Sequence, residues 1–463
     1  MKIKKSIKLL SGLLAVILVA GTLAGCGGKN AAEQSTAGVS AGTAAQSTGA
    51  EANAAQSGGE EKTLVAVMWG EQARWDAQKK VNDAFTQKYP NLKIDLQTLP
   101  NDTYWTKLQT MIAGGTPPDI AFMQEMLTPT YQAKGIMADL TDYMGKDTSF
   151  KKDCMPEGMY GPFTVDGKLY AMPTMTFVNV LFYNKDIFDK AGIPYPDENY
   201  TWDTLRETAK QLTKDTNGDG KIDQYGFSFG AWPNFIFPYI WANGGEFIKD
   251  DRKTSVLNSA ENVQTFQYLH DLIWKDKVTP SAAANKSNAF DFANGNIAMF
   301  DLGSWNVAVY DDKKINYGIT LTPKAPNGGR VVNTFPNGWF IVNQSENKED
   351  AWKYLAFNVS EEGQKVAAEG KVGMPANTQI AKSDAYLKSS TTPGVDLGVT
   401  LKSAEISRGA YTTSNWSEIE SKIWPEFDLI WTKENADVKA VLDSVQTKLQ
   451  AKVNEANNLS QPL

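Results

Sequence analysis

One acidic loop has the residue types and the spacing of a metal site. Its side-chain oxygens fall at positions 1, 3, 5 and 9 of a calcium-type loop and come from Asp215, Asn217, Asp219 and Asp223. Gly220 stands at position 6, where the chain must turn sharply, but Gly226 at position 12 replaces the bidentate glutamate of a complete EF-hand. The spacing predicts a structural calcium ion, and the alternative is a polar turn between a helix and a strand. We expect no other cofactor.

Side chains for nucleophilic or transition-metal chemistry are scarce. His270 is the only histidine, which excludes sites built on several imidazoles. It follows Val263 on a predicted helix, where a histidine packed in the core is expected. Two cysteines are too few for a disulfide framework, and Cys154 is expected to be a packed thiol because Cys26 has another use. We therefore expect a protein that is not an enzyme.

Composition and charge narrow the classes of partner. Of the 463 residues, 42% are hydrophobic and 21% are charged, which is typical of a globular protein with a large core, and the length favours two domains or lobes. The formal net charge is -7. Because an acidic protein gains nothing from releasing phosphate counterions, we expect no nucleic-acid partner and no attraction to anionic membrane surfaces. We also expect a monomer.

The first 62 residues have the composition of an export signal followed by a tether. Four lysines precede an apolar run from Leu9 to Ala20, which is too short to remain as a membrane-spanning helix. Leu23-Ala24-Gly25-Cys26 resembles the bacterial lipobox, in which cleavage before the cysteine leaves a diacylglyceryl group on its sulfur. We expect residues 1–25 to be a lipoprotein signal peptide and residues 26–62, which lack aromatic side chains, to be a disordered tether. The folded body would then lie outside the cell, anchored by lipid to the outer face of the membrane. An ordinary signal peptide that contains a cysteine is the alternative.

From Thr63 onward, short apolar runs alternate with segments of helical periodicity. The runs that predict strands cover residues 64–68, 92–96, 119–122, 297–302, 317–321 and 338–342. Helices are predicted over residues 78–89, 103–112, 201–212, 259–273 and 437–453, with two shorter ones between residues 348 and 370. Thr201 and Ser259 are predicted N-caps of their helices. This alternation indicates an α/β fold with a largely parallel sheet.

Several segments, taken in order, resemble the extracellular solute-binding proteins of the sugar-type ABC importers. They are Met68-Trp69-Gly70, Phe85-Thr86-Gln87-Lys88-Tyr89-Pro90, residues 113–120 (Ala-Gly-Gly-Thr-Pro-Pro-Asp-Ile), residues 181–188 (Leu-Phe-Tyr-Asn-Lys-Asp-Ile-Phe), residues 292–299 (Phe-Ala-Asn-Gly-Asn-Ile-Ala-Met) and Gly303-Ser304-Trp305. Each motif is short, but the ordered set covers the chain from Thr63 to the C-terminal helix. The resemblance implies a two-lobed, periplasmic-binding-protein-like α/β fold that captures a carbohydrate. It also implies delivery of that sugar to the permease subunits of an ABC transporter.

The ligand of such a protein lies in a cleft between hinged lobes, and closure around it removes water from the cleft. We expect the first lobe to comprise residues 63–175 and 306–345. The second lobe would comprise residues 176–305 and 346–463, including the C-terminal helices. The chain should cross between the lobes near residues 172–180 and again near residues 300–305.

A sugar has apolar C–H faces and a rim of hydroxyls, so its site needs aromatic rings and planar polar groups. The expected stacking residues are Trp69, Trp232, Trp305 and Trp339, with Trp241 and Trp416 behind them. The expected polar contacts are Glu71, Gln124, Glu125, Asn179, Asp301, Ser304 and Asn337, because turns after the strands of α/β folds hold ligand groups. Core packing is the alternative for each tryptophan, and a solvated loop position is the alternative for each polar residue.

Three other functions stay open. A secreted glycoside hydrolase would need two carboxylates facing one sugar ring, and 53 acidic residues leave room for such a pair. The same fold can hold a peptide, a polyamine or chelated iron, although a single histidine makes iron unattractive. A surface adhesion module would bind a polymer without closure of a cleft.

Overall fold

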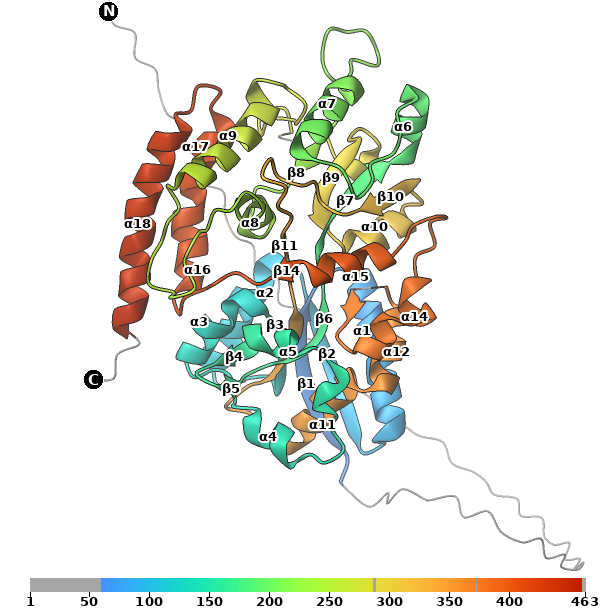
Figure 1. Cartoon of the computed structure of the whole chain (residues 1–463). Coiled ribbons are helices and arrows are strands. Elements are labelled where there is room, and N and C mark those ends of the chain that lie inside the picture. Colours follow the sequence, from blue (N-terminus) through green and yellow to red (C-terminus); the bar gives the residue numbers. More distant parts are fainter. Residues whose placement is uncertain (1–59, 286–288, 372, 460–463) are drawn as a thin grey trace, which may run out of the picture. The chain divides into compact units, whose positions relative to one another are not determined.

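The structure is a computed structural model that describes residues 60–285, 289–371 and 373–459 (Figure 1). These residues fall within one compact unit, Ser57–Leu463, in which helices cover two larger β-sheets, and two further pairs of short strands are present. The predicted signal peptide, Cys26 and the tether as far as residue 59 lie outside the described residues. Strands and helices alternate as the sequence predicts, which confirms the α/β fold class.

Six strands form the first sheet, in the order β13-β6-β12-β3-β1-β2. They are β1 (Lys62–Trp69), β2 (Leu92–Leu99), β3 (Ile120–Gln124), β6 (Met172–Thr176), β12 (Asn337–Ile341) and β13 (Met374–Pro375). The helices α1 (Gln72–Lys88) and α2 (Asn101–Ala113) connect β1, β2 and β3, which pair in parallel. β12 runs antiparallel to β3 and β6, so the sheet is mixed and not largely parallel as the sequence predicts. Every residue of β12 is buried, as expected for a strand in the middle of a covered sheet.

Four strands form the second sheet, in the order β10-β7-β9-β8. They are β7 (Asn179–Asn184), β8 (Ser228–Phe229), β9 (Met299–Gly303) and β10 (Tyr317–Thr320). Its neighbouring helices are α6 (Lys185–Ala191), α7 (Trp202–Leu212), α8 (Pro233–Ala242), α9 (Ala260–Trp274) and α10 (Asn306–Asp312). Both predicted N-caps are confirmed, because the side chain of Thr201 accepts a hydrogen bond from the Thr204 amide and that of Ser259 accepts one from the Asn262 amide.

Segments that connect the two sheets run side by side. Phe177 and Val178 lead directly from β6 to β7, within the region where the first crossing is predicted. The return segment from β10 to β12 contains Phe335, and the backbones of Phe177 and Phe335 exchange two hydrogen bonds with N···O distances of 3.3 and 2.9 Å. The return segment also contains β11 (Val332–Asn333), which pairs in parallel with β14 (Ser407–Arg408). Figure 1 shows β11 and β14 between the two sheets.

The second crossing differs from the prediction near residues 300–305. After β9 the chain stays with the second sheet through α10 and β10, because β10 pairs with β7, and it returns only after Thr320. Farther along, α11 (Lys348–Val359) and α12 (Glu361–Glu369) pack on the first sheet and on α1, and β13 pairs with β6. Residues 306–320 therefore belong with the second sheet and residues 346–375 with the first, contrary to the expected lobe boundaries. An apolar run predicts a strand, but it does not specify the sheet to which the strand adds.

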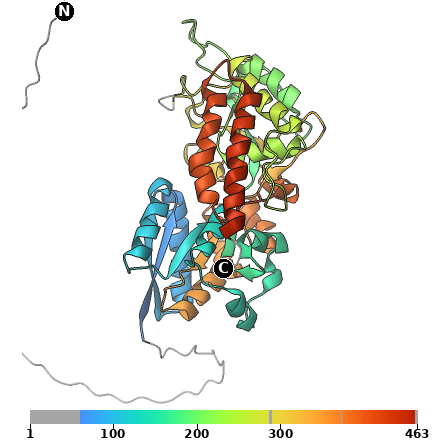
Figure 2. The same cartoon turned by 90° about the vertical axis from the view of Figure 1, so that its left-hand side faces the viewer.

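The C-terminal part of the chain contacts both halves of the unit. α16 (Trp416–Glu418), a π-helix (Ile419–Ile423), a 3-10 segment (Trp424–Phe427) and α17 (Asp428–Thr432) form one continuous stretch beside α18 (Val438–Leu459) (Figure 2). α18 packs on α9, whereas α16 packs on a 3-10 turn (Glu125–Leu127) and α3 (Thr128–Ala133), which follow β3. Shorter elements are α4 (Thr141–Lys146), α5 (Glu157–Tyr160), β4 (Thr164–Val165), β5 (Lys168–Leu169), α13 (Thr378–Ala381), α14 (Asp384–Leu387) and α15 (Gly398–Glu405). In the part of the chain that the structure describes, we find no helix with the length and apolarity needed to cross a membrane.

Candidate functional site

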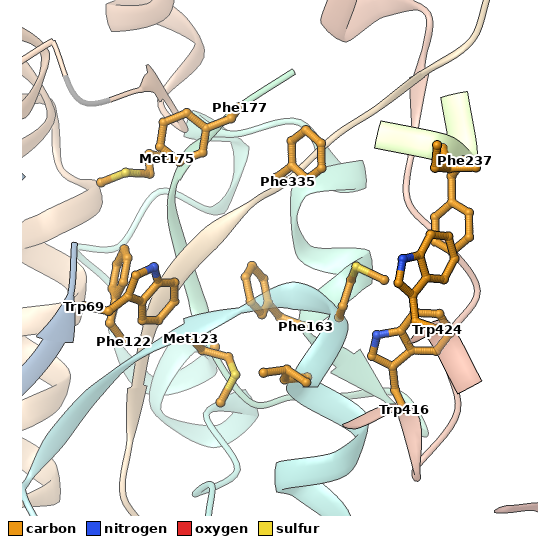
Figure 3. Packing of buried hydrophobic residues seen from close by; sticks show 14 of the residues in the cluster. Trp69, Phe122, Met123, Phe163, Met175, Phe177, Phe237, Phe335, Trp416 and Trp424 are labelled. Atoms are coloured by element: carbon orange, nitrogen blue, oxygen red, sulfur yellow. The ribbon is translucent and has the colours of Figure 1, made fainter. Parts of the chain in front are cut away.

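Aromatic side chains gather near the first crossing, where Figure 3 shows Trp69 beside Phe122 and, nearby, Phe177 and Phe335 of the crossing segments. Trp69, the last residue of β1, contacts Phe122 of β3, with ring centroids 4.7 Å apart. Phe177 at the crossing and Trp305 after β9 lie 5.4 Å apart. Arg74 of α1 joins these two pairs, because its guanidinium carbon is 6.0 Å from the Phe122 ring centre and 5.3 Å from that of Phe177. The predicted residues Trp69 and Trp305 therefore belong to one cluster, in which Trp305 is partly buried. Trp69 is buried in the core, contrary to the expectation that its ring is open for stacking.

Trp232 is the only tryptophan among the large hydrophobic side chains that are exposed in the described part of the chain, with 61% of its surface accessible. It is the N-cap of α8, three residues before Phe235, whose ring lies 5.9 Å from that of Trp305. Pro233 follows it at the first helical position, where its fixed backbone angle suits the start of a helix. An open indole face therefore lies at the edge of the aromatic cluster.

Trp339 has a different environment from the one predicted. Its side chain is fully buried on β12, with its ring 4.8 Å from Phe122 and 5.6 Å from Tyr354. The structure places it in the core of the first sheet, which corrects the expectation that its ring is available for stacking. Trp241 and Trp416, which we expected behind the stacking residues, are buried as well.

The polar residues predicted on the first sheet gather at the end of β3. Gln124 pairs across the sheet with Asn337, and Asn337 donates a hydrogen bond of 2.9 Å to the carbonyl of Phe335. Glu125 follows Gln124 and is only 4% exposed, and neither of its carboxyl oxygens has a hydrogen-bond partner. Burial raises the pKa of Glu125 to about 8, and the nearby carboxyl of Glu420 on the π-helix adds to this rise.

Glu71, also predicted, lies apart from these residues as the exposed N-cap of α1. Its side chain makes no capping hydrogen bond. Within the first sheet, the structure therefore brings together Gln124, Glu125 and Asn337 but leaves Glu71 in solvent.

The polar residues predicted on the second sheet are buried around the crossings. Asp301 of β9 is 2% exposed, and one of its oxygens accepts a hydrogen bond of 2.8 Å from the hydroxyl of Tyr239. Burial raises the pKa of Asp301 to about 7. Asn179 accepts a hydrogen bond of 3.2 Å from the backbone amide of Asn333, and Ser304 accepts one of 3.3 Å from that of Val178. Asn179 and Ser304 thus hold the crossing segments in place.

The predicted calcium loop is held by its own side chains. The carboxylate of Asp215 accepts two hydrogen bonds of 2.7 Å from backbone amides of the loop. Asn217, Asp219 and Asp223 accept further bonds from backbone amides of the same loop. Within the described residues, no three acidic, histidine or cysteine side chains converge as a metal site requires. The bound ion stays a prediction, and the turn is formed by the protein alone.

One serine stands in a sequence context found in many hydrolases, Gly-x-Ser-x-Gly at residues 226–230. Ser228 lies within β8, where it pairs with Phe300 of β9, so it is a strand residue rather than the turn residue that a nucleophile elbow requires. His270 is buried on α9, with Nε2 3.1 Å from the carbonyl oxygen of Lys433. The histidine therefore occupies the core position predicted for it.

Comparison with known proteins gives the family. The sequence profile of bacterial extracellular solute-binding proteins matches residues 76–365, more than half of the chain. The chain belongs to this family. An arabinooligosaccharide-binding protein of Bacillus subtilis is 31% identical over 220 residues, which are 45% of this chain and 48% of that protein.

Solved structures agree with the family assignment. The chain is similar to an ABC substrate-binding protein of Listeria monocytogenes in complex with cycloalternan, with 27% identity and a TM-score of 0.78 over 85% of this chain and 100% of that one. Maltose-bound MalE3 of T. maritima shares the fold, with 21% identity and a TM-score of 0.71 over 84% of this chain and 99% of that one. These matches confirm the two-lobed α/β fold and the family resemblance found in the sequence.

Sequence reasoning missed several residues of the site. Arg74 lies on the first turns of the helix that follows β1, and its position one turn after Gly70 could have drawn attention to it. Phe177 and Phe335 were not singled out because their importance depends on the pairing of two distant segments. Glu420 gave no signal in the sequence, since its contribution arises from the packing of the C-terminal stretch on the turn after β3.

Proposed function

We propose that this solute-binding protein captures a carbohydrate outside the cell and delivers it, chemically unchanged, to the permease of an ABC importer. The observation that carries the proposal is the exposed indole of Trp232 at the edge of the cluster containing Trp305. An indole face suits the apolar C–H face of a sugar ring, whereas a peptide or polyamine cargo favours carboxylates. The sugar ligands named for the relatives support the same class of cargo.

The polar groups near this cluster suit a ligand rich in hydroxyls. Gln124 is only partly buried at the end of β3, and one buried carboxyl oxygen of Asp301 lacks a well-aligned hydrogen bond, although the side chain of Asn179 lies near this carboxyl. Buried polar atoms without partners are rare in proteins, so each is a candidate to bind a ligand hydroxyl or a water molecule. These polar groups would hydrogen-bond the hydroxyls and orient the sugar, while indole rings contact its apolar C–H faces.

A thermal-shift screen over mono- and oligosaccharides tests the proposal. We also propose that the protein binds its sugar as a monomer. A ligand at 100 times its dissociation constant stabilises the folded state by about 2.7 kcal/mol, which raises the melting temperature measurably. Trp232→Ala should abolish the shift and leave the melting temperature of the free protein unchanged, because this side chain is exposed. Tyr195→Ala is the matched control, since Tyr195 is also an exposed aromatic residue. A shift with dipeptides or polyamines and none with sugars would contradict the proposal.

The alternative of a glycoside hydrolase is tested on the same samples. Incubation of the protein with each sugar that binds should release no reducing ends, because capture makes and breaks no glycosidic bond. Release that disappears in Glu125→Gln or Asp301→Asn would instead assign acid–base chemistry to the carboxyls with raised pKa values.

The anchor is part of the proposal as well. Cleavage before Cys26 and acylation of its sulfur would hold the protein on the outer face of the membrane, and two acyl chains are enough for stable attachment. In cells, Cys26→Ala should move the protein from the membrane fraction to the medium, whereas Cys154→Ala should leave it in place. Equal membrane attachment of both variants would exclude the lipid anchor.

A further inference from the structure

Among the residues that the structure describes, none accepts a hydrogen bond from the side chain of Arg74. Its Nε atom is buried without a partner, and the side chain makes neither a hydrogen bond nor an ion pair with any described residue. A guanidinium carries five N–H donors and keeps its charge at all physiological pH values. Only Nε is buried, so the terminal N–H groups of this half-buried side chain remain available to water or to a ligand that carries acceptors.

The two aromatic rings near Arg74 contact the guanidinium group but accept no conventional hydrogen bond from it. Phe122 and Phe177 lie 6.0 and 5.3 Å from the guanidinium carbon, distances at which ring and cation attract each other. Such contacts leave the N–H groups at the edge of the guanidinium available, and this edge matches a carboxylate in a bidentate geometry. The same rings contact Trp69 and Trp305, so Arg74 lies between two of the predicted stacking residues.

The position of Arg74 is supported by the backbone before it. Gly70 has a φ of +151°, and a Cβ atom at this position would lie 2.7 Å from Cδ of Arg74. A larger residue would therefore be strained and would push the arginine side chain away. The turn after β1 thus leaves room for the stem of Arg74 beside the strand end.

The carboxyls near the junction do not neutralise Arg74. Glu71 is the acid that acts on it electrostatically, but its side chain is exposed and does not bond to the guanidinium. Glu125 has a pKa of about 8 and is therefore protonated at neutral pH. Asp301 accepts a hydrogen bond from the hydroxyl of Tyr239 and makes no ion pair with Arg74. A negative charge at this point of the junction would have to come from the ligand.

We propose that Arg74 binds the carboxylate of an acidic sugar, so that the cargo is an oligosaccharide containing a uronic acid. This inference rests on the proposed function and specifies its class of substrate. A neutral hydroxyl would replace the hydrogen bonds of lost water but would leave the guanidinium charge uncompensated. A carboxylate supplies both the acceptors and the opposite charge.

Isothermal titration calorimetry with two disaccharides of the same linkage tests this inference on the full mature chain. Digalacturonic acid should bind at least about tenfold more tightly than neutral galactobiose, the usual effect of one charge-assisted bidentate contact. Arg74→Gln should remove this preference, so that the variant binds the two disaccharides with affinities within about twofold of each other. Arg74→Lys keeps the charge but lacks the planar fork, so it should retain only part of the preference. Arg252→Gln, at an exposed arginine, is the matched control.

The outcomes separate this inference from the proposed function. Equal affinities of the wild type for the two sugars, or an acid preference that survives in Arg74→Gln, would overturn the role of Arg74 while leaving sugar capture intact. Failure of both disaccharides and of every sugar in the thermal-shift screen, with binding of a dipeptide or polyamine, would overturn the proposed function itself. Melting curves of both Arg74 variants guard against misfolding, and Arg74→Lys keeps the test valid if Arg74→Gln does not fold.

Discussion

The carboxyl of Glu125 should make the stability of the protein fall as the pH rises. Burial raises its pKa from 4.5 to about 8 in the folded state, whereas the unfolded chain has the ordinary value. Between these two values the folded protein holds a proton that the unfolded chain has lost, so unfolding becomes easier with each unit of pH. The contribution of Glu125 to the free energy of unfolding is fully present below pH 4.5 and is lost as the pH rises through 8.

The magnitude follows from the shift. One pKa unit corresponds to about 1.4 kcal/mol. The free energy of unfolding at pH 7 should therefore be roughly 3 kcal/mol lower than at pH 4.5. Glu125→Gln has a similar shape and cannot ionise, so its free energy of unfolding should lack this slope. The assay is urea unfolding of both proteins from pH 5 to pH 8. The difference in free energy between variant and wild type should grow in favour of the variant as the pH rises.

Glu418→Gln is the matched control for this experiment. Glu418 lies on the same C-terminal stretch but is exposed, and its ion pairs with Lys422 and Lys452 lower its pKa. Its removal should therefore leave the slope between pH 5 and pH 8 unchanged. Parallel curves for wild type and Glu125→Gln over this range would refute the argument, because they would mean that Glu125 ionises at its ordinary pH despite its burial.

Three further results are expected. Asp301→Asn should remove a second loss of stability between about pH 4 and pH 7, measured by the same urea series extended down to pH 4; an unchanged slope would show that Asp301 ionises normally. Trp339→Ala should lower the free energy of unfolding by about 3–5 kcal/mol, because it empties a fully buried site, and a loss below about 1 kcal/mol would contradict its place in the core. Calcium should raise the melting temperature of the wild type but not of Asp215→Asn, and the absence of any shift in the wild type would leave the loop a polar turn.

The local elements of the fold could be predicted, but their arrangement in sheets could not. Apolar runs and caps such as Thr201 and Ser259 act within a few residues, so their effect is visible in the sequence. The pairing of β10 with β7 brings together segments more than 130 residues apart, and no local pattern records it. The prediction of the second crossing was wrong for this reason.

The site shows the same division between local and distant effects. Trp69 and Trp305 could be selected because Trp69 ends β1 and Trp305 closely follows β9, and α/β folds place ligand groups at such strand ends. The burial of Trp339 is decided by Phe122 and Tyr354, which come from distant parts of the chain. Arg74 lies in α1 but before the helix predicted over residues 78–89, and its surroundings become visible only when the first crossing is folded beside it.

The most direct test of sugar capture is a crystal structure of the protein in complex with a sugar. The sugar to use is the one that gives the largest thermal shift. The proposal predicts an intact sugar whose ring lies on the indole of Trp232 and whose polar groups reach the junction formed by Trp69, Arg74 and Trp305. A sugar bound at another surface, or a cleaved sugar in this place, would contradict the account of reversible capture between the two sheets.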